Sequence, residues 1–296
     1  MGIGTFINAT CTLLEDDDSL HVAGLEAHLL DQWKHGVDGL LVAGTMGMMP
    51  MLRNTTYRSL VEKSIQISAG RGEILVGAGD TSFGRTRDRI EFLNNCCIDG
   101  VVVMAPYLFR PSGADLISYF QALADVSRAP LYLYDLPTVT GVEIGLDAYS
   151  ELAEHPNIHG AKVSGRFVVA RHLTETMGDR FRVIIAEPDM VDMVLRQGFS
   201  DHLDGIYAVA PHWLARLREA ASAGNWTEAA AYTNRFLRLR LLLRQSSNPG
   251  GLVTAWLNAR GIPGRVFFGP AEPLLDLHQQ SLVDDEVVRE LCEKKL

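Results

Sequence analysis

The chain has 296 residues, of which 47% are hydrophobic, and its formal net charge is −9 with a pI of about 5.5. This acidic balance excludes nucleic acid and anionic membranes as expected partners, because both bind basic faces. It leaves a small anionic substrate open, since such a substrate needs only local hydrogen-bond donors. No apolar run reaches roughly 18 residues, and no basic region precedes a long apolar stretch at the N-terminus, so we predict neither a membrane span nor a signal peptide.

Cysteine usage is sparse, and none of the cysteines forms a CxxC pair. Few, unpaired cysteines are typical of a reducing compartment, so we expect a cytoplasmic protein with free thiols. We expect neither a metal nor another cofactor, because no group of His, Cys and Asp residues has the spacing of metal ligands. The cysteines are Cys11, Cys96, Cys97 and Cys292.

Eight short apolar runs are predicted to be β-strands. Several consist almost entirely of β-branched and aliphatic residues, as in Val101–Val103, which is typical of a parallel sheet covered on both faces. The predicted strands are Thr5–Cys11, Asp38–Ala43, Ile74–Gly79, Gly100–Met104, Leu131–Tyr134, Ile158–Lys162, Arg182–Ala186 and Leu203–Tyr207.

Amphipathic stretches between these runs are predicted to be helices. Alternation of eight strands with helices over about 210 residues is typical of a (β/α)₈ TIM barrel, an α/β fold. A doubly wound open sheet is the alternative, although no Gly-x-Gly-x-x-Gly motif follows the first strand. The predicted helices are Val22–His35, Thr55–Ala69, Gly84–Asn95, Gly113–Val126, Leu146–Ala153, Phe167–Thr176 and Pro188–Gln197.

The predicted strands stop at about residue 210, and the rest of the chain is predicted to be helical. We therefore expect a barrel in residues 1–210 and a C-terminal helical extension in residues 211–296, packed on the barrel or on a partner subunit. Residues 246–251 are expected to form a loop. The predicted helices of the extension are Trp213–Ala223, Trp226–Gln245, Leu252–Arg260 and Asp284–Lys294.

Lys162 is the first candidate for catalysis. Of the five lysines in the chain, it alone ends a segment that is predicted to be a buried strand, and catalytic groups of these barrels lie at the carboxyl ends of strands. Burial disfavours the ammonium form, and a neutral amine can attack a ketone to form a Schiff base. The alternative is a strand-end lysine whose ammonium group reaches water.

Three other strand ends bring polar groups to the same mouth of the barrel. Gly44-Thr45-Met46-Gly47 is either an ordinary loop or a carboxylate-binding loop that uses backbone N–H groups and the Thr45 hydroxyl. Tyr134 is either a core aromatic residue or a proton donor to a Schiff-base intermediate. Glu187 and Asp189 follow the seventh strand, and for Asp189 we favour a role at a helix start.

These motifs, in the order Gly-Thr-x-Gly, Tyr-x-x-Pro-x-x-x-Gly and Gly-x-Lys, resemble the dihydrodipicolinate synthase / N-acetylneuraminate lyase superfamily of class I aldolases. The resemblance covers nearly the whole chain, from residues 8–12 through Ala105-Pro106-Tyr107 to Gly205. It implies that Lys162 forms a Schiff base with pyruvate or another 2-oxo acid, and that Tyr134 shuttles protons.

The resemblance implies further roles around these two residues. The Thr45 hydroxyl, with the backbone N–H groups of Thr45 and Met46, would bind the carboxylate of the 2-oxo acid. Tyr107 would lie near a subunit interface, with Leu108 beside it. The resemblance also implies a homotetramer built as a dimer of dimers.

Several positions differ from the family pattern. Met48 replaces a frequent glutamate, Leu108 replaces a relay tyrosine, and Val139 replaces an arginine that binds a second carboxylate in the synthase. Loss of that arginine removes a fixed two-pronged donor, and residues 134–141 are instead similar to 2-keto-3-deoxy sugar-acid aldolases. Glu187 replaces a frequent glycine, and it either accepts sugar hydroxyls, acts as a base in dehydration or faces solvent.

We therefore predict a Schiff-base lyase or aldolase that acts on pyruvate or a 2-keto-3-deoxy sugar acid. The alternatives are a 4-hydroxy-tetrahydrodipicolinate synthase-type condensation, a Schiff-base dehydratase, and a catalytically weak relative that only binds a 2-oxo acid. The predicted catalytic residues are Lys162, Tyr134 and Thr45. The predicted substrate-binding residues are Gly44, Thr45, Met46, Val139 and Glu187.

Overall fold

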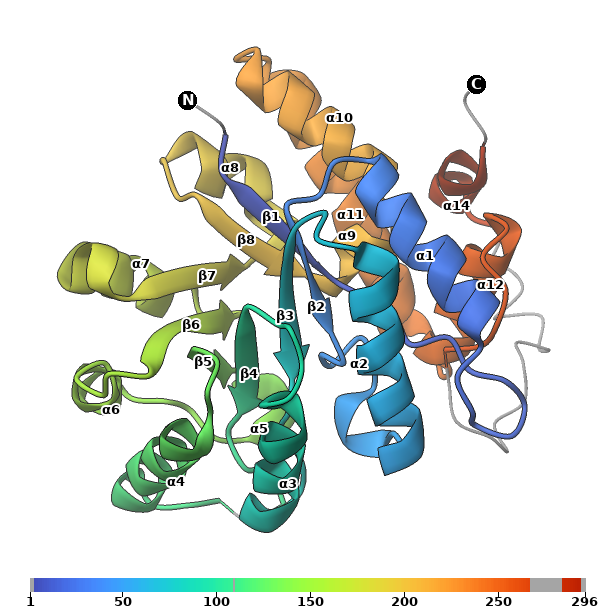
Figure 1. Ribbon diagram of the computed structural model, residues 1–296. Helices are drawn as coiled ribbons and strands as arrows, with labels where there is room; N and C mark the ends of the chain where they lie inside the picture. The colour runs from blue at the N-terminus through green and yellow to red at the C-terminus, as the bar shows by residue number, and fades with distance from the viewer. Residues whose placement is uncertain (1–2, 109, 267–283, 294–296) are drawn as a thin grey trace.

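The computed structural model describes residues 3–108, 110–266 and 284–293. Eight parallel strands form a closed barrel in which each strand lies beside its neighbours in sequence and β8 pairs with β1 (Figure 1). The closed barrel confirms the predicted TIM-barrel fold, and it excludes the open sheet. The strands are β1 (Thr5–Ala9), β2 (Gly39–Val42), β3 (Glu73–Gly77), β4 (Gly100–Met104), β5 (Leu131–Asp135), β6 (Ile158–Ser164), β7 (Arg182–Ala186) and β8 (Asp201–Asp204).

Helices cover the outside of the barrel, so the strands are buried on both faces. Every residue of β2 and β4 is buried, which explains why these strands have no polar positions. The helices between strands are α1 (Val22–Lys34), α2 (Asn54–Ser68), α3 (Phe83–Leu93), α4 (Gly113–Val126), α5 (Pro137–Thr140), α6 (Leu146–Leu152), α7 (Phe167–Met177) and α8 (Val191–Arg196). Short 3₁₀ helices are η1 (Met49–Met51), η2 (Gly178–Arg180) and η3 (Pro188–Met190).

The C-terminal helices gather on the side of the barrel that carries α1 and β8 (Figure 1). They are α10 (Pro211–Ser222), α11 (Trp226–Gln245), α12 (Pro249–Ala259) and α14 (Glu286–Cys292). Phe236 of α11 packs edge-on against Tyr207, with ring centroids 5.2 Å apart. Arg260 donates hydrogen bonds to the Val209 carbonyl at 2.6 Å and to Asp31 Oδ2 at 2.7 Å, which ties the end of α12 to the barrel and α1. The division of the chain at residue 210 stays a prediction.

Several predicted boundaries were wrong, among them those of the sixth and eighth strands and of the loop before α12. The eighth strand ends at Asp204 rather than Tyr207, because the Asp204 side chain accepts a hydrogen bond from the Ile206 N–H at 2.9 Å and begins the short helix α9 (Gly205–Val209). The sixth strand continues past Lys162 to Ser164. The predicted loop at residues 246–251 ends early, since Asn248 caps α12 by accepting a hydrogen bond from the Gly251 N–H at 2.8 Å.

The last predicted helix, Asp284–Lys294, is described only in part. The structure contains α14 over Glu286–Cys292, and Lys294 lies outside the described residues. Among the helices that the structure describes, none combines the length and the apolar character needed to cross a membrane.

Candidate active site

Lys162 and Tyr134 lie side by side on neighbouring strands at the carboxyl end of the barrel. They are register partners between β5 and β6, so their side chains leave the sheet on the same face. The Lys162 Nζ atom lies 4.0 Å from the centroid of the Tyr134 ring. Both residues are buried, with exposures of 3% and 4%. Within the described part of the chain, no carboxylate forms an ion pair with Lys162.

Thr45 joins this pair from the loop that follows β2. Its Oγ1 donates a hydrogen bond to the Tyr134 hydroxyl at 3.1 Å. Thr45 is exposed, whereas Tyr134 is buried, so this hydrogen bond links the outer face of the site with the tyrosine whose ring lies against the amine. The structure thus brings together the three residues that the sequence singled out as catalytic.

The loop around Thr45 has a strained, tightly closed backbone. Ala43 and Met48 have φ values of 51° and 58°, a region that residues other than glycine rarely adopt. The Met48 N–H donates to the Thr45 carbonyl at 3.0 Å, and the Met49 N–H donates to the Gly44 carbonyl at 3.2 Å. Strain of this kind is often retained at functional sites, where the surrounding structure holds it.

Two backbone N–H groups of this loop, those of Thr45 and Met46, are free to bind a ligand. Among the described residues, none accepts a hydrogen bond from the N–H of Thr45 or of Met46. Met46 itself is half-buried and covers Gly205, where an added Cβ would lie 2.8 Å from the Met46 Cβ and Cγ atoms. The loop therefore spans from β2 to the end of β8, with two unpaired N–H groups beside the Thr45 hydroxyl.

A buried ion pair ties the ends of β5 and β6 beside the site, and the sequence analysis did not assign it. Asp135, next to Tyr134, is fully buried and accepts hydrogen bonds from Arg166 Nη1 and from the Tyr149 hydroxyl, the latter at 3.1 Å. Burial raises the pKa of Asp135, and the Arg166 charge and these hydrogen bonds offset that effect only in part. The one signal in the sequence was an aspartate directly after the predicted strand Leu131–Tyr134, which in the structure extends to include it.

Glu187 lies at the rim of the barrel, half-buried between β7 and the start of α7. Burial raises its pKa, and the neighbouring charge of Asp189 also raises it, while Arg240 and the Phe167 N–H group lower it. Asp189 forms an ion pair with Arg240 of α11 at 2.8 Å, so this carboxylate also anchors the C-terminal helices. Neither Lys162 nor Tyr134 is among the described contacts of Glu187.

Two of the positions that differ from the family pattern are apolar and accessible. Leu108 and Val139 are 64% and 53% exposed, although both are large hydrophobic residues. Tyr107 is half-buried, its hydroxyl has no hydrogen-bond partner among the described residues, and burial raises its pKa. Its location near a subunit interface stays a prediction. The described residues contain no group of three or more His, Cys, Asp or Glu side chains arranged to hold a metal ion.

Comparison of sequences identifies one family. The family model of the dihydrodipicolinate synthetase family matches residues 3–287. The 4-hydroxy-tetrahydrodipicolinate synthase of Methanosphaerula palustris is 31% identical over 249 residues, which cover 82% of this chain and 84% of that relative. The enzyme of the same name from an Exiguobacterium species is 29% identical and covers 86% of each chain.

Comparison of structures identifies the same fold. YagE, a prophage protein of the dihydrodipicolinic acid synthase family from E. coli solved in complex with pyruvate, matches with a TM-score of 0.87 and 24% identity, over 97% of this chain and 98% of YagE. Dihydrodipicolinate synthase from Aquifex aeolicus matches with a TM-score of 0.86 and 22% identity, over 99% of both chains. At these identities the structural likeness establishes the barrel and leaves the substrate open.

Proposed function

Because the chain belongs to the dihydrodipicolinate synthetase family of class I Schiff-base lyases, we propose that Lys162 forms a Schiff base with pyruvate or a 2-keto-3-deoxy sugar acid. The enzyme would then make or break a carbon–carbon bond next to the 2-oxo group. One observation carries this proposal: the enclosed Lys162 amine faces the Tyr134 ring, whose hydroxyl is hydrogen-bonded to Thr45.

The proposed chemistry uses the lysine as an electron sink. The Lys162 amine adds to the ketone carbon, and loss of water from the adduct gives an iminium. In the cleavage direction, the hydroxyl of the substrate loses its proton, the electron pair of the carbon–carbon bond moves into the iminium, and an aldehyde leaves. The resulting enamine takes up a proton at carbon, and water then releases pyruvate and the free amine.

Tyr134 and Thr45 are proposed to move the protons and to bind the acid group. The Tyr134 ring lies against the amine, and the hydrogen bond between the Thr45 and Tyr134 hydroxyls supports passage of a proton toward the outer face of the site. The unpaired N–H groups of Thr45 and Met46 suit the carboxylate of the 2-oxo acid, because adjacent backbone donors form anion-binding concavities. A glycine suits position 44, because an added Cβ there would lie 2.9 Å from the Leu41 Cδ2 atom.

The second part of the substrate is proposed to be a polyhydroxy chain rather than a second acid. Val139 and Leu108 offer exposed apolar surface where an arginine fork and a relay tyrosine are expected in the synthase. Glu187 at the rim is proposed to accept sugar hydroxyls. A dehydratase that uses the same Schiff base would use Glu187 as its base.

A second candidate is 4-hydroxy-tetrahydrodipicolinate synthesis. Curated relatives with identities of 31% and 29% carry that name. The two functions differ in what happens after the Schiff base, so one panel of substrates separates them. We expect retro-aldol release of pyruvate from a 2-keto-3-deoxy sugar acid. Condensation of pyruvate with a four-carbon amino aldehyde that carries its own carboxylate, giving 4-hydroxy-tetrahydrodipicolinate, would support the second candidate instead.

The Schiff base itself is tested by trapping. The protein is incubated with pyruvate and reduced with borohydride, and its mass is measured before and after digestion by mass spectrometry. We expect one adduct, on Lys162. The variant Lys162→Met should show none, whereas the control Lys63→Met should keep the adduct, because Lys63 lies on the exposed face of α2. Absence of an adduct on the wild-type chain with pyruvate and with the sugar acids would contradict the proposal.

We also propose that the enzyme works as a cytoplasmic homotetramer. The free cysteines suit a reducing compartment, and the exposed side chains of Val168 and Met193 are apolar surfaces of the kind that subunits bury. Light scattering after gel filtration measures the oligomeric state directly, and a monomer would contradict it.

A further inference from the structure

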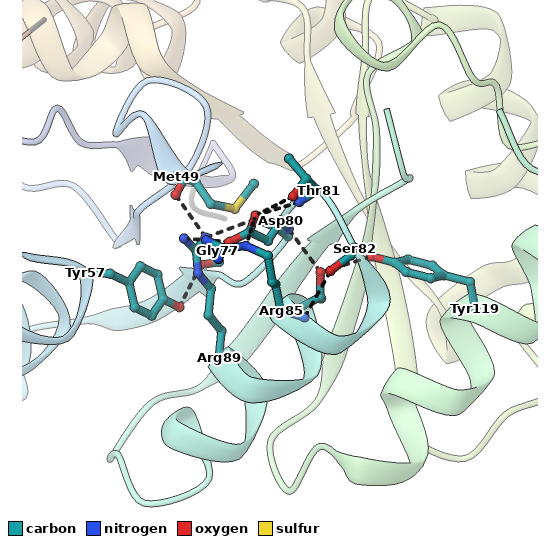
Figure 2. Close-up of polar contacts among 11 residues, drawn as sticks. Met49, Tyr57, Gly77, Asp80, Thr81, Ser82, Arg85, Arg89 and Tyr119 are labelled. Carbon is teal, nitrogen blue, oxygen red and sulfur yellow. Dashed lines mark hydrogen bonds and ion pairs between the residues drawn. The ribbon is translucent and has the colours of Figure 1, made fainter. Parts of the chain in front are cut away.

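A buried ion pair supports the loop of residues 44–49, which is here named the carboxylate loop. Asp80 follows β3, and Arg89 lies on α3; the two residues are only 3% and 4% exposed. Their side chains meet with Arg89 Nη2 at 3.0 Å from Asp80 Oδ2 (Figure 2). Burying both charges is costly unless each is paired and hydrogen-bonded. A buried pair of this kind is therefore expected to have a structural or functional role.

One nitrogen of Arg89, Nη1, donates hydrogen bonds to two backbone carbonyls, whereas its Nε has no hydrogen-bond partner among the described residues. Its Nη1 donates to the Met49 carbonyl at 2.9 Å and to the Gly79 carbonyl at 3.1 Å. Its guanidinium also lies over the Tyr57 ring, with Cζ 4.5 Å from the centroid, and the Tyr57 hydroxyl donates to the Gly77 carbonyl at 2.9 Å. One cation therefore joins the last residue of the carboxylate loop to the end of β3.

Asp80 is held in the charged form that this arrangement needs. Arg85 Nε donates to Asp80 Oδ1 at 2.9 Å, and the Thr81 N–H donates to the same oxygen at 2.6 Å. Burial raises the pKa of Asp80, but these hydrogen bonds and the charges of Arg89 and Arg85 outweigh it, so the pKa lies below its ordinary value. Asp80 thus orients Arg89 through its Oδ2 atom, whereas Arg85 contacts the Oδ1 atom of the same carboxylate (Figure 2).

A shift at Met49 would reach Thr45 through the backbone. The Met49 N–H closes the loop onto the Gly44 carbonyl, and the Met48 N–H closes it onto the Thr45 carbonyl. The loop also has little room behind it, because an added Cβ on Gly77 would lie 2.1 Å from the Ala43 carbonyl oxygen. The loop is short, and these two hydrogen bonds close it, so they connect Met49 to the backbone that carries the Thr45 and Met46 N–H groups.

We propose that Arg89, oriented by Asp80, is a positioning residue that sets the geometry of the carboxylate loop and thereby the affinity for the acid group of the substrate. This inference rests on the proposed function of the loop. Arg89 does not meet the substrate itself; it acts through the Met49 carbonyl. A lysine cannot replace it, because a single ammonium lacks the planar fork that reaches Met49, Gly79 and Asp80 together.

The test measures borohydride trapping on Lys162 as a function of pyruvate concentration. In Arg89→Lys we expect the half-saturating pyruvate concentration to rise about tenfold, with the adduct at saturation unchanged, because the amine and Tyr134 are untouched. The matched control is Arg85→Gln, which loses an ion pair to the same carboxylate but has no described bond to the loop. Its half-saturating concentration should stay within about twofold of wild type.

Two outcomes overturn the inference: an unchanged half-saturating concentration in folded Arg89→Lys, or an equal rise in Arg85→Gln. If Arg89→Lys does not fold, the double variant Asp80→Asn with Arg89→Gln removes both charges together and is measured in its place.

Hydrogen exchange gives a second readout that needs no adduct. Amides of residues 44–49 should exchange faster in Arg89→Lys than in wild type and Arg85→Gln, and equal exchange in all three would also overturn the inference. Failure of the wild-type chain to form any adduct would instead contradict the proposed function, while the exchange comparison still decides whether Arg89 anchors the loop.

Discussion

The Lys162 amine lies against an aromatic ring, 4.0 Å from the Tyr134 centroid, and no carboxylate of the described residues pairs with it. The face of an aromatic ring offers a lysine amine a favourable contact without an ion pair. Asp135 is adjacent to Tyr134 in sequence, yet its carboxylate pairs with Arg166. The carboxylate nearest in sequence to Tyr134 therefore pairs with Arg166 and not with Lys162.

The hydroxyl of Tyr134 is expected to matter for turnover and not for the first adduct. In Tyr134→Phe the borohydride adduct on Lys162 should still form with pyruvate, because the ring beside the amine remains. Turnover should fall roughly 10²- to 10⁴-fold, the usual loss when a positioned proton donor is removed. Steady-state rates with the best substrate of the panel measure this effect.

Tyr132→Phe is the matched control for that variant. Tyr132 lies on the same strand, but its hydroxyl is beside Arg182 rather than Thr45. It should turn over within about twofold of wild type. A wild-type turnover rate in Tyr134→Phe would contradict the proposed role of the Tyr134 hydroxyl in proton transfer.

At the scale of elements, the end of β3 is packed so closely that only glycine fits. A Cβ on Gly77 would lie 2.1 Å from the Ala43 carbonyl oxygen and 2.8 Å from the Met49 sulfur. We expect Gly77→Ala to cost roughly 1–3 kcal/mol of unfolding free energy, the usual effect of overpacking. Urea denaturation measures it.

The control for this substitution is Gly84→Ala on α3, where nothing lies within 4 Å of the added methyl group. Alanine should stabilise that helix by roughly 0.5–1 kcal/mol, because glycine loses more backbone freedom on folding. Equal stability of the two variants would show that the close approach at Gly77 is relieved at no cost.

The Asp135–Arg166 pair is expected to stabilise the joined ends of β5 and β6. Arg166→Gln leaves the fully buried Asp135 carboxylate without its cation, and such losses cost roughly 3–5 kcal/mol. Arg180→Gln, which breaks an exposed pair with Glu154, should change the unfolding free energy by less than about 1 kcal/mol. If the two variants unfold at the same urea concentration, the buried pair does not stabilise these strands.

For the whole molecule, buried histidines predict a loss of stability in acid. Burial lowers the pKa of His28 and of His202 from 6.5 to about 4. At pH values between the unfolded pKa of 6.5 and the folded pKa of about 4, these histidines bind protons in the unfolded chain but not in the folded protein. The unfolding free energy therefore falls as the pH falls through this range. The expected loss is roughly 2 kcal/mol for each histidine between pH 7.5 and pH 5.

Urea midpoints at several pH values check this prediction. In His202→Gln the unfolding free energy should fall by roughly 2 kcal/mol less than in wild type between pH 7.5 and pH 5, because one of the two buried histidines is gone. His159→Gln, at an exposed position of β6, should follow the wild-type curve. A pH dependence that is the same in all three chains would assign the acid sensitivity to other groups.

The fold could be predicted from the sequence because each element carries its own signature. Strands covered on both faces need continuous apolar runs, and the helices between them need one apolar face. The prediction failed at Gly205–Val209, an apolar run as compatible with a short helix as with a strand. There the structure depends on the cap that the Asp204 side chain provides to the Ile206 N–H.

The sequence by itself determined the order of the elements and the lysine, tyrosine and threonine that end up in one site, because strand ends of a barrel converge on one mouth. Only the tertiary structure decided which buried charges meet. Arg166 pairs with Asp135 across 31 residues, and Arg89 reaches the Met49 carbonyl across 40. Such contacts depend on strand register and on the direction of each helix against the barrel, and no local pattern of residues encodes either.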